Sequence, residues 1–353
     1  MDDWWEKLAA TYRFDPVTTL ALGSIDTGFT SVAAGLSVTE AFNDPGKSFN
    51  ARLEGEKRFG FAPLPRIIRH TLLGAHDFGG DVRLPSSPLD QAMKVVAHPI
   101  SDESGVLALE APDPKTAGGI ETAMQFSKLQ HQTGGIVWFH HRSPFTMAAN
   151  ICGMEWFGRW MIRKPDLCDH LIDMALDHIF NVLDYWIDTF GSHNIAVYNS
   201  SPMESNQLIS PKHFERFALP SHQRYINRLN RSGITRYFFH VCGEQNHNLP
   251  YLSGIADWHH PAIISIGHEV EISEAARFFP EDIIYGNIDP QIIQSESPQK
   301  VDQICQKTLE QGKTVDAGFI LALGCDLPVF APVENVSAMK HAVTKFRGST
   351  FGF

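Results

Sequence analysis

Long apolar runs, basic clusters and a paired set of cysteines are all missing from this 353-residue chain, and each absence excludes a class of protein. No stretch approaches the roughly 20 consecutive apolar residues that a membrane-spanning helix needs, so we expect no membrane partner. Only 29 Lys and Arg residues stand against 40 Asp and Glu, a formal net charge of -11. Because so acidic a chain repels phosphate backbones, we expect no nucleic acid partner. The acidic first residues, 1–6, lack the pattern of a secretion signal and predict a cytoplasmic protein.

The five cysteines are an odd number spread over a long chain, which argues against a disulfide framework. Each is then expected to be a free thiol, a buried apolar side chain or a metal ligand. Cys152, Cys168 and Cys305 fall in helical or loop patterns without polar partners, and we interpret them as structural. Cys242 and Cys325 are therefore the thiols to which chemistry can be assigned.

Short apolar strands alternate with helices through the second half of the chain, and this alternation predicts parallel strands joined by crossover helices. The predicted strands are 19–25, 134–140, 194–200, 235–243, 262–268, 282–288 and 318–324. Their number favours a single (β/α)8 barrel over residues 1–353, and an open doubly wound sheet is the alternative. Residues 1–17 are predicted as an N-terminal helical extension, and the proline-rich stretch 80–119 as an irregular excursion.

Three potential metal ligands stand where predicted strands end. His240 and Cys242 are two residues apart, so their side chains point to the same face of the strand. Cys325 has the equivalent place after a later strand. Because the carboxyl ends of barrel strands meet at one mouth, the three side chains are expected to converge there. Two thiolates and an imidazole suit zinc, and three protein ligands leave one position open, as catalytic zinc sites do.

Further polar residues follow the predicted strands toward the same mouth. Glu204 and Glu269 are candidates for a fourth metal ligand, and Glu204 is also a candidate catalytic residue. Asn287 is a candidate catalytic residue, and Asp289 and His268 are candidates for binding a cofactor. A role in forming the turn is the alternative for Asn287 and Asp289. Three weaker candidates follow early strands: Asp26, His140 and His141. The pair His259 and His260 precedes a strand, and we interpret it as structural.

From about residue 134 to its end, the sequence resembles the uroporphyrinogen decarboxylase superfamily. The resemblance rests on the segments Ser-Pro-Phe-Thr (143–146), Leu-Ile-Ser-Pro-Lys-His-Phe (208–214), Gly-Asn-Ile-Asp-Pro (286–290), Gly-Cys (324–325) and Pro-Val-Glu-Asn-Val-Ser-Ala-Met (332–339). One branch of the superfamily consists of metal-free decarboxylases with an arginine-rich N-terminal segment that grips the porphyrinogen. This sequence has only scattered early arginines, such as Arg58, Arg66 and Arg69.

The sequence is more similar to the other branch, the corrinoid-dependent methyltransferases, which include the methylcobamide:coenzyme M methyltransferases. Their zinc motif, His-X-Cys followed far downstream by Cys, maps onto His240, Cys242 and Cys325. The resemblance implies that zinc binds the heteroatom of a small thiol acceptor or methylated donor, and that a separate corrinoid protein carries the cobalamin. It also makes Asn199 a candidate catalytic residue, although many relatives carry an acid at such a strand end. Two other functions stay open, a porphyrinogen decarboxylase and a barrel that binds zinc or a thiol without catalysis.

Overall fold

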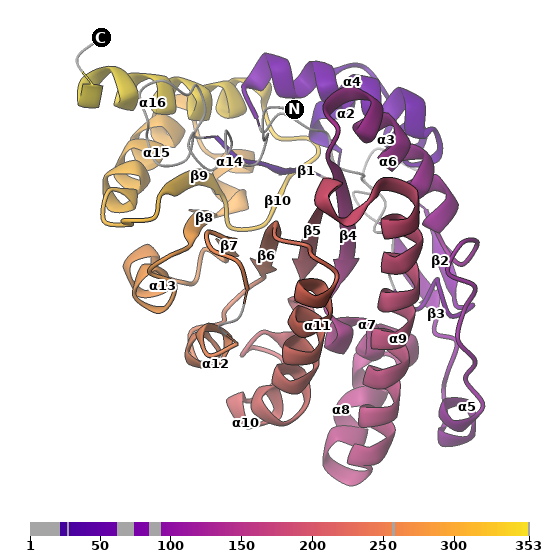
Figure 1. Ribbon diagram of the computed structural model, residues 1–353. Coiled ribbons are helices and arrows are strands. Elements are labelled where there is room, and N and C mark those ends of the chain that lie inside the picture. The colour runs from indigo at the N-terminus through magenta and orange to yellow at the C-terminus, as the bar shows by residue number, and fades with distance from the viewer. Residues whose placement is uncertain (1–21, 27, 62–73, 85–92, 256–257, 352–353) are drawn as a thin grey trace.

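The computed structural model describes residues 22–26, 28–61, 74–84, 93–255 and 258–351 (Figure 1). The predicted N-terminal extension, residues 1–17, lies outside these ranges. Within the described part of the chain, no helix combines the length and the apolar character that crossing a membrane requires.

Six parallel strands form one sheet, and their order in space is their order along the chain. They are β4 (Val137–Arg142), β5 (Ile195–Ser200), β6 (Tyr237–Val241), β7 (Ile263–Ile266), β8 (Ile283–Ile288) and β9 (Phe319–Leu323). The segment that holds β1 (Ile25–Asp26) lies beside β9, because Leu22 bridges Leu321 and β1 pairs in parallel with β10 (Asp326–Leu327). Sequential parallel neighbours joined by helices have the topology of a (β/α)8 barrel.

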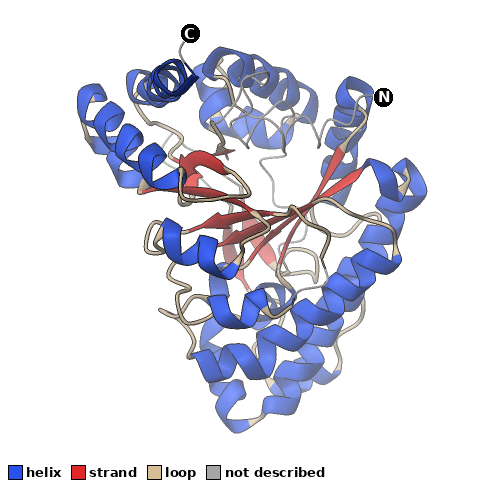
Figure 2. Cartoon of the chain, turned by 60° about the vertical axis from the view of Figure 1, so that its left-hand side comes forward, coloured by secondary structure: helices blue, strands red, loops and turns tan. Residues whose placement is uncertain are grey.

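The two faces of the sheet distinguish a barrel from an open sheet. One face carries an inner cluster of buried side chains: Ile25, Ile136, Trp138, Ala196, Tyr198, Phe238, Ile263, Ile283, Tyr285, Ile320 and Ala322. The other face packs against the helices in a larger, separate cluster. Figure 2 shows the helices arranged around the outside of the strands. Because an open doubly wound sheet has helices on both faces, the prediction of an α/β barrel is confirmed.

Four aromatic side chains fill the inner face of the sheet, beneath the carboxyl ends of the strands. Tyr198 and Phe238 are paired across β5 and β6, and their rings stack with centroids 4.9 Å apart. Phe238 also meets Trp138 and Tyr285, at centroid distances of 6.2 and 5.0 Å. All four side chains are buried. We call Trp138, Tyr198, Phe238 and Tyr285 the aromatic floor, because they close the barrel interior below the strand ends.

Ser-Pro pairs start three of the outer helices. Proline suits the first turn of a helix, and the preceding serine accepts a hydrogen bond from a backbone N–H that the helix cannot satisfy. This contact is made by Ser143, Ser210 and Ser297 at the start of α7 (Pro144–Cys152), α10 (Pro211–His213) and α15 (Pro298–Gly312). The Ser-Pro pairs therefore fix where these three helices begin.

The helices that follow the strands of the sheet cover its outer face. They are α7 (Pro144–Cys152), α8 (Met154–Arg163), α9 (Pro165–Phe190), α10 (Pro211–His213), α11 (Leu219–Arg231), α12 (Leu249–Ser253), α13 (Ile272–Phe278), α14 (Pro290–Ser295), α15 (Pro298–Gly312) and α16 (Val333–Phe351). Short 3-10 turns lie at Ser192–Asn194 and Pro202–Glu204, and a π-helical turn at Phe214–Ala218 joins α10 to α11.

The first part of the chain is more irregular. Its helices are α2 (Phe29–Ala33), α3 (Val38–Asn43), α4 (Pro45–Phe59), α5 (Glu103–Leu107) and α6 (Ile120–Gly134). Within the predicted excursion 80–119, β2 (Asp81–Arg83) and β3 (Lys94–Ala97) form an antiparallel pair separate from the barrel sheet.

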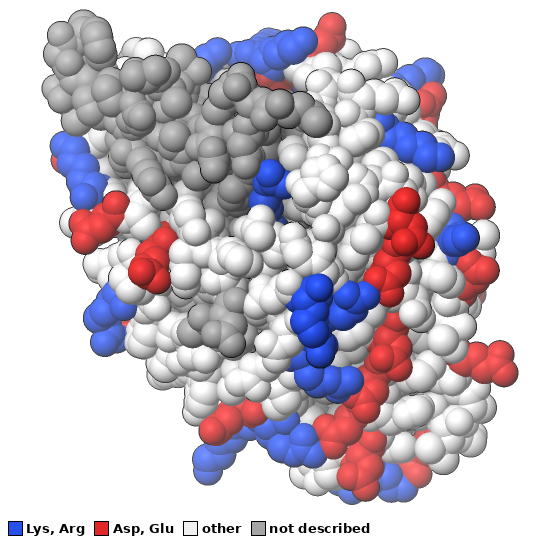
Figure 3. Space-filling model, in the orientation of Figure 1, with Lys and Arg blue, Asp and Glu red and all other residues white. Residues whose placement is uncertain are grey.

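Ion pairs join α9 to the helical segment that contains α11 across the molecular surface. Arg216 contacts Asp169 at 2.6 Å, Arg224 pairs with Asp173, and Arg228 pairs with Asp184. Figure 3 shows basic and acidic side chains side by side on this face of the molecule. These arginines have carboxylate partners within the fold, so their charges are already balanced.

Candidate metal centre

The structure brings together the three residues predicted to bind metal. His240 lies on β6, Cys242 follows it, and Cys325 lies between β9 and β10. Their ligand atoms all lie within 4.8 Å of one another, and the two sulfurs are 3.8 Å apart. The two cysteines are 83 positions apart in the sequence, and the barrel brings them together because the ends of β6 and β9 converge on one mouth.

The backbone after β9 approaches the backbone after β7 very closely, and this approach places Cys325. A Cβ atom on Gly324 would lie 2.5 Å from the backbone nitrogen of His268. Only glycine fits so close a contact without a shift of the chain. Gly324 therefore allows the Cys325 loop to bend in toward β6.

The two thiols share their protons unequally. A hydrogen bond from Cys242 lowers the pKa of Cys325 below that of an ordinary thiol, and the neighbouring ring of His240 lowers it further. The same contact with Cys325, together with burial, raises the pKa of Cys242. One thiolate is thus favoured in the metal-free chain, and a bound divalent cation would take the place of the remaining proton.

The buried hydroxyl of Ser265 orients the imidazole of His240. The two residues are paired across β6 and β7, and His240 Nδ1 lies 2.9 Å from Ser265 Oγ. An imidazole that donates its Nδ1–H in this way keeps the lone pair of Nε2 for a metal. Two sulfur donors and one nitrogen donor, with the other ring nitrogen of His240 hydrogen-bonded to Ser265, fit a zinc ion.

Replacing Ser265 with Ala is expected to weaken zinc binding by about 10- to 100-fold, because the ring of His240 loses the group that fixes its orientation. Competition with a chromogenic chelator would measure the affinity. Ser253→Ala serves as the matched control, since Ser253 is a half-buried serine at the end of α12 whose hydroxyl bonds the carbonyl oxygen of Pro250 in its own helix. Equal zinc affinity in Ser265→Ala and the parent chain would show that Ser265 does not orient the ligand.

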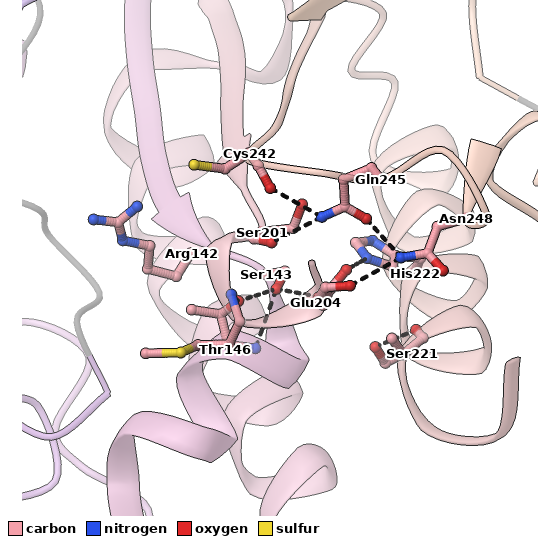
Figure 4. Close-up of polar contacts among 12 residues, drawn as sticks. Arg142, Ser143, Thr146, Ser201, Glu204, Ser221, His222, Cys242, Gln245 and Asn248 are labelled. Carbon is pink, nitrogen blue, oxygen red and sulfur yellow. Dashed lines mark hydrogen bonds and ion pairs between the residues drawn. The ribbon is translucent and has the colours of Figure 1, made fainter. Parts of the chain in front are cut away.

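An arginine that the sequence analysis missed stands at the end of β4. Arg142 donates a hydrogen bond from Nη1 to Ser200 Oγ at 2.8 Å. In the close-up its side chain extends in the same direction as that of Cys242 (Figure 4). The predicted strand ended at His140, but β4 continues to Arg142. Extending the strand by two residues would have placed Arg142 on the inner face, by the same alternation that paired His240 with Cys242.

Glu204 is held in a buried hydrogen-bond network and, among the described residues, is not part of the candidate ligand group of His240, Cys242 and Cys325. Its carboxylate accepts hydrogen bonds from Ser143 Oγ and, at 2.7 Å, from His222 Nε2 (Figure 4). The three side chains come from the start of α7, the turn after β5, and α11. The network therefore ties two helices to the strand end beside the metal centre.

The loop that carries Cys242 is braced by two buried amides that the sequence analysis also missed. Gln245 Nε2 donates to the carbonyl oxygen of Cys242 at 3.1 Å. Asn248 Nδ2 lies 2.6 Å from Gln245 Oε1 and 2.9 Å from the carbonyl oxygen of Glu204. Both amides are fully buried, so the loops after β5 and β6 are joined by side chains without surface access. Isolated amides in a loop carry no periodic signal by which sequence analysis could have found them.

Asn199 and Asn287 occupy different surroundings. Asn199 neighbours the inward-facing Tyr198 and Ser200 on β5, so its own side chain points to the outer face, where it lines a small apolar cavity with His222. Asn287 Nδ2 donates to the carbonyl oxygen of Val270 at 2.6 Å and so links the ends of β7 and β8. The structure therefore brings Asn287, but not the side chain of Asn199, to the inner edge of the sheet.

His268, Glu269 and Asp289 gather at the end of β7 and β8. The ring of His268 lies 3.5 Å from a Glu269 oxygen and 4.0 Å from an Asp289 oxygen. Asp289 also caps α14 by accepting a hydrogen bond from the backbone N–H of Gln291, which is the turn role left open by the sequence. In the described residues, Glu269 is not part of the ligand group of His240, Cys242 and Cys325.

Three further candidates each have a partner within the fold. Asp26 accepts hydrogen bonds from the start of α2 and lies 3.7 Å from Arg52, and its environment is that of a helix cap. His141 faces the helices, where its Nε2 lies 2.5 Å from the hydroxyl of Tyr225 and burial lowers its pKa to about 4. His140 packs its ring against Tyr198, 4.4 Å away, inside the barrel.

Four of the residues interpreted as structural, the three remaining cysteines and His260, are buried or held by a partner, whereas His259 is exposed. Burial raises the pKa of Cys152 and of Cys305 to about 12, and it also raises that of Cys168. Such thiols are poor ligands and poor nucleophiles. His260 Nδ1 lies 2.7 Å from Asp282, which precedes β8, at the end of the barrel opposite the metal centre.

Comparison with solved structures supports the assignment of the fold. A methyltransferase from Methanosarcina mazei superposes with a TM-score of 0.81 over 97% of this chain and 98% of its own, at 19% sequence identity. At that identity the likeness concerns the fold alone.

Sequence relatives carry two kinds of name. A methylcobamide:CoM methyltransferase MtbA of Methanosarcina mazei is 26% identical over 205 residues, which cover 58% of this chain and 56% of the relative. A methylated-thiol–coenzyme M methyltransferase of the same organism is 26% identical over 206 residues, 57% of this chain and 50% of the relative. The chain thus matches little more than half the length of these relatives. A uroporphyrinogen decarboxylase of Prochlorococcus marinus is 24% identical over 261 residues, 70% of each chain.

The family profile settles the relationship that the resemblance predicted. The profile described as uroporphyrinogen decarboxylase (URO-D) matches residues 16–346, nearly the whole chain. The match includes the first part of the barrel, where the motifs quoted from the sequence are absent. The chain belongs to the uroporphyrinogen decarboxylase family.

Proposed function

We propose that this protein is a zinc-dependent methyltransferase that moves a methyl group between a small substrate, a thiol or a methylated compound, and a corrinoid protein. The observation that carries the proposal is the convergence of His240, Cys242 and Cys325 at the mouth of the barrel. Catalytic residues of such barrels lie at this end of the strands, whereas the opposite end serves stability.

The ligand set supports a catalytic rather than a structural zinc. Structural zinc sites use four protein ligands, while this group has three in the described residues and leaves a coordination position for substrate. Bound zinc would supply Lewis acidity, which lowers the pKa of a coordinated thiol or improves a methylated leaving group. The chain itself holds the ring of His240 through Ser265 and closes the site from below with the aromatic floor.

The names of the relatives support a corrinoid partner. Three of the curated relatives are methylcobamide:CoM methyltransferases of Methanosarcina mazei, Methanosarcina acetivorans and Methanosarcina barkeri, at 25–27% identity. By analogy, a corrinoid protein would present its cobalamin to the carboxyl ends of the strands. That face carries the metal ligands, so methyl transfer would take place between the partner and the substrate on the barrel.

A porphyrinogen decarboxylase is the second candidate function, because two relatives with that name match 70–71% of the chain, although at 21–24% identity. The paired thiols beside His240 argue against it, since a metal-free decarboxylase has no use for a thiolate pair at this position. A barrel that binds zinc without catalysis would have the same ligands and differs only in turnover. Activity measurements on the zinc-loaded chain therefore separate the three functions.

The zinc-loaded protein is expected to transfer the methyl group of methylcobalamin to a small thiol, and removal of zinc by a chelator should abolish the reaction. Loss of methylcobalamin absorbance, with mass spectrometry of the methylated thiol, measures the transfer. Zinc returned after dialysis should restore the rate, which controls for damage by the chelator. Zinc binding without methyl transfer, either to any thiol or from any methylated compound to cobalamin, would favour the non-catalytic barrel. Decarboxylation of uroporphyrinogen by the metal-free chain would favour the decarboxylase.

A further inference from the structure

We infer that Gln245 is a positioning residue of the metal centre: its carboxamide fixes the backbone of Cys242 and so sets the direction in which the Cys242 sulfur is presented to the metal. The inference rests on the proposed function, because it concerns how one ligand of the proposed zinc site is held. It assigns a part in zinc affinity to a fully buried side chain that is not itself one of the candidate ligands.

Cys242 lies where the sheet no longer holds the backbone. On one side of β6 the pairing with β7 ends at Val241, which is paired with Ile266, and on the other side the pairing with β5 ends at His240. Cys242 therefore lies beyond both strand pairings. Gly243 follows it in the left-handed conformation, with a φ of 77°. Because glycine has more backbone freedom than any other residue, the end of the strand does not by itself fix Cys242.

Cys325, the other thiol of the centre, is held by backbone contacts on both sides. The N–H of Gly324, which precedes it, donates to the carbonyl oxygen of Ile288 at 2.8 Å. Asp326, which follows it, is paired with Ile25 where β10 meets β1. Of the two thiols, Cys242 is thus the one that needs a further restraint.

Gln245 supplies this restraint from the loop after β6. Its Nε2 donates to the carbonyl oxygen of Cys242 at 3.1 Å and lies 3.5 Å from the carbonyl oxygen of Ser201, the residue after β5 (Figure 4). The backbone N–H of Ser201 donates in turn to the carbonyl oxygen of His240 at 3.2 Å. The end of β5 is therefore joined to both ligands that β6 and its loop provide, directly to His240 and through Gln245 to Cys242.

The partners of Gln245 require a carboxamide and exclude a carboxylate. Its Nε2 faces two carbonyl oxygens, which only accept hydrogen bonds, and its Oε1 accepts from Asn248 Nδ2 at 2.6 Å. Asn248 also donates to the carbonyl oxygen of Glu204 and accepts from Asn206 Nδ2 at 3.0 Å. Each amide nitrogen in this chain thus faces an acceptor. Because Gln245 is fully buried, the loss of its donor would leave the carbonyl oxygen of Cys242 without this hydrogen bond.

The test replaces Gln245 in two ways. Gln245→Glu puts an acceptor where the donor was, and Gln245→Met has a similar length and no donor. Asn335→Asp is the matched control, since Asn335 is also a buried amide that donates to two backbone carbonyl oxygens, those of Ile293 and Glu296 at 2.9 and 2.8 Å. Its hydrogen bonds join α16 to the end of α14 and do not reach the Cys242 loop.

Three quantities are measured on the full chain. Competition with a chromogenic chelator gives the zinc affinity, and urea denaturation gives the stability. The absorption spectrum of the Co²⁺-loaded protein reports how many thiolates bind the metal and in what geometry. A side chain that served stability alone would not alter this spectrum.

Both Gln245 variants are expected to bind zinc about 10- to 100-fold more weakly than the parent chain, because a ligand has lost the group that orients it. Thiolate-to-cobalt absorption should fall toward that of a single thiolate. Asn335→Asp should unfold at lower urea concentration, since a buried donor is lost there too, while its zinc affinity and cobalt spectrum stay those of the parent. A loss shared by Gln245→Glu and Gln245→Met would be due to the missing donor, because only the first adds a charge.

Two results would overturn the inference. One is a zinc affinity and a cobalt spectrum that match the parent chain in both Gln245 variants. The other is an equal loss of zinc affinity in Asn335→Asp, which would mean that the metal responds to the stability of the whole fold. None of these measurements requires methyl transfer. Weakened metal binding in the Gln245 variants of a chain that transfers no methyl group would leave the positioning role standing and refute the proposed function.

Discussion

The Cys325→Ala variant is expected to purify without zinc and to lose methyl transfer, while it unfolds in the same cooperative transition as the parent chain. Two remaining ligands cannot hold zinc at a site built for three, so zinc should fall from about one ion per chain to nearly none. Without the Lewis acid, the transfer rate should fall by at least about a thousandfold. Elemental analysis, the methylcobalamin assay and thermal unfolding followed by circular dichroism measure the three quantities.

The fold should survive because Cys325 contributes little to the core. Its side chain is only partly buried at the barrel mouth, and the inner cluster beneath it is complete without it. Cys305→Ala is the matched control. Cys305 is fully buried on α15, so its loss should cost some stability and leave zinc content unchanged. A large drop in the unfolding temperature of Cys325→Ala would mean that the metal is structural, and retained zinc would mean that the ligand set is different.

The sequence predicted the second half of the barrel because two local signals agreed there. Apolar runs such as 318–324 are short enough for strands and are separated by helices that begin with Ser-Pro. The ligand pair needs only the two-residue alternation of one strand, which is a local property. Cys325 followed from topology, since parallel strands of a barrel end at one mouth. Each of these inferences used information contained within one element or its fold class.

Features that depend on contacts between elements could not be predicted in this way. Successive side chains of a strand point to opposite faces of the sheet, and Asn199 falls on the outer face. A motif alone does not tell which of its residues face inward. Arg142 was overlooked because β4 is two residues longer than its apolar pattern. Glu204 was predicted from its position after a strand, but its surroundings depend on Ser143 and His222, which are far away in the sequence. Such partners are fixed by packing and not by periodicity.

Glu204 is the candidate whose environment changes its expected role most. Its carboxylate is 1 % exposed and has two hydrogen-bond partners, Ser143 and His222, which are also buried. A carboxylate so engaged has little capacity left for a metal or a substrate. The contacts indicate that Glu204 holds α7 and α11 to the end of β5, beside the candidate metal centre. Its role would then be to fix the arrangement of these elements around the site.

Glu204→Leu is therefore expected to lower the free energy of unfolding by about 2–3 kcal/mol, because the ring of His222 would be left buried without its carboxylate partner, whereas Ser143 keeps its hydrogen bonds to Thr146. Urea denaturation measures the change. Glu204→Gln is the matched variant: its amide retains an acceptor and a donor, so the cost should stay below about 2 kcal/mol and zinc content should be unchanged. If Glu204→Gln instead kept the stability of the parent but lost zinc or methyl transfer, the carboxylate would be acting on the metal or the substrate. The difference between the two variants thus separates a carboxylate that supports the site from one that takes part in its chemistry.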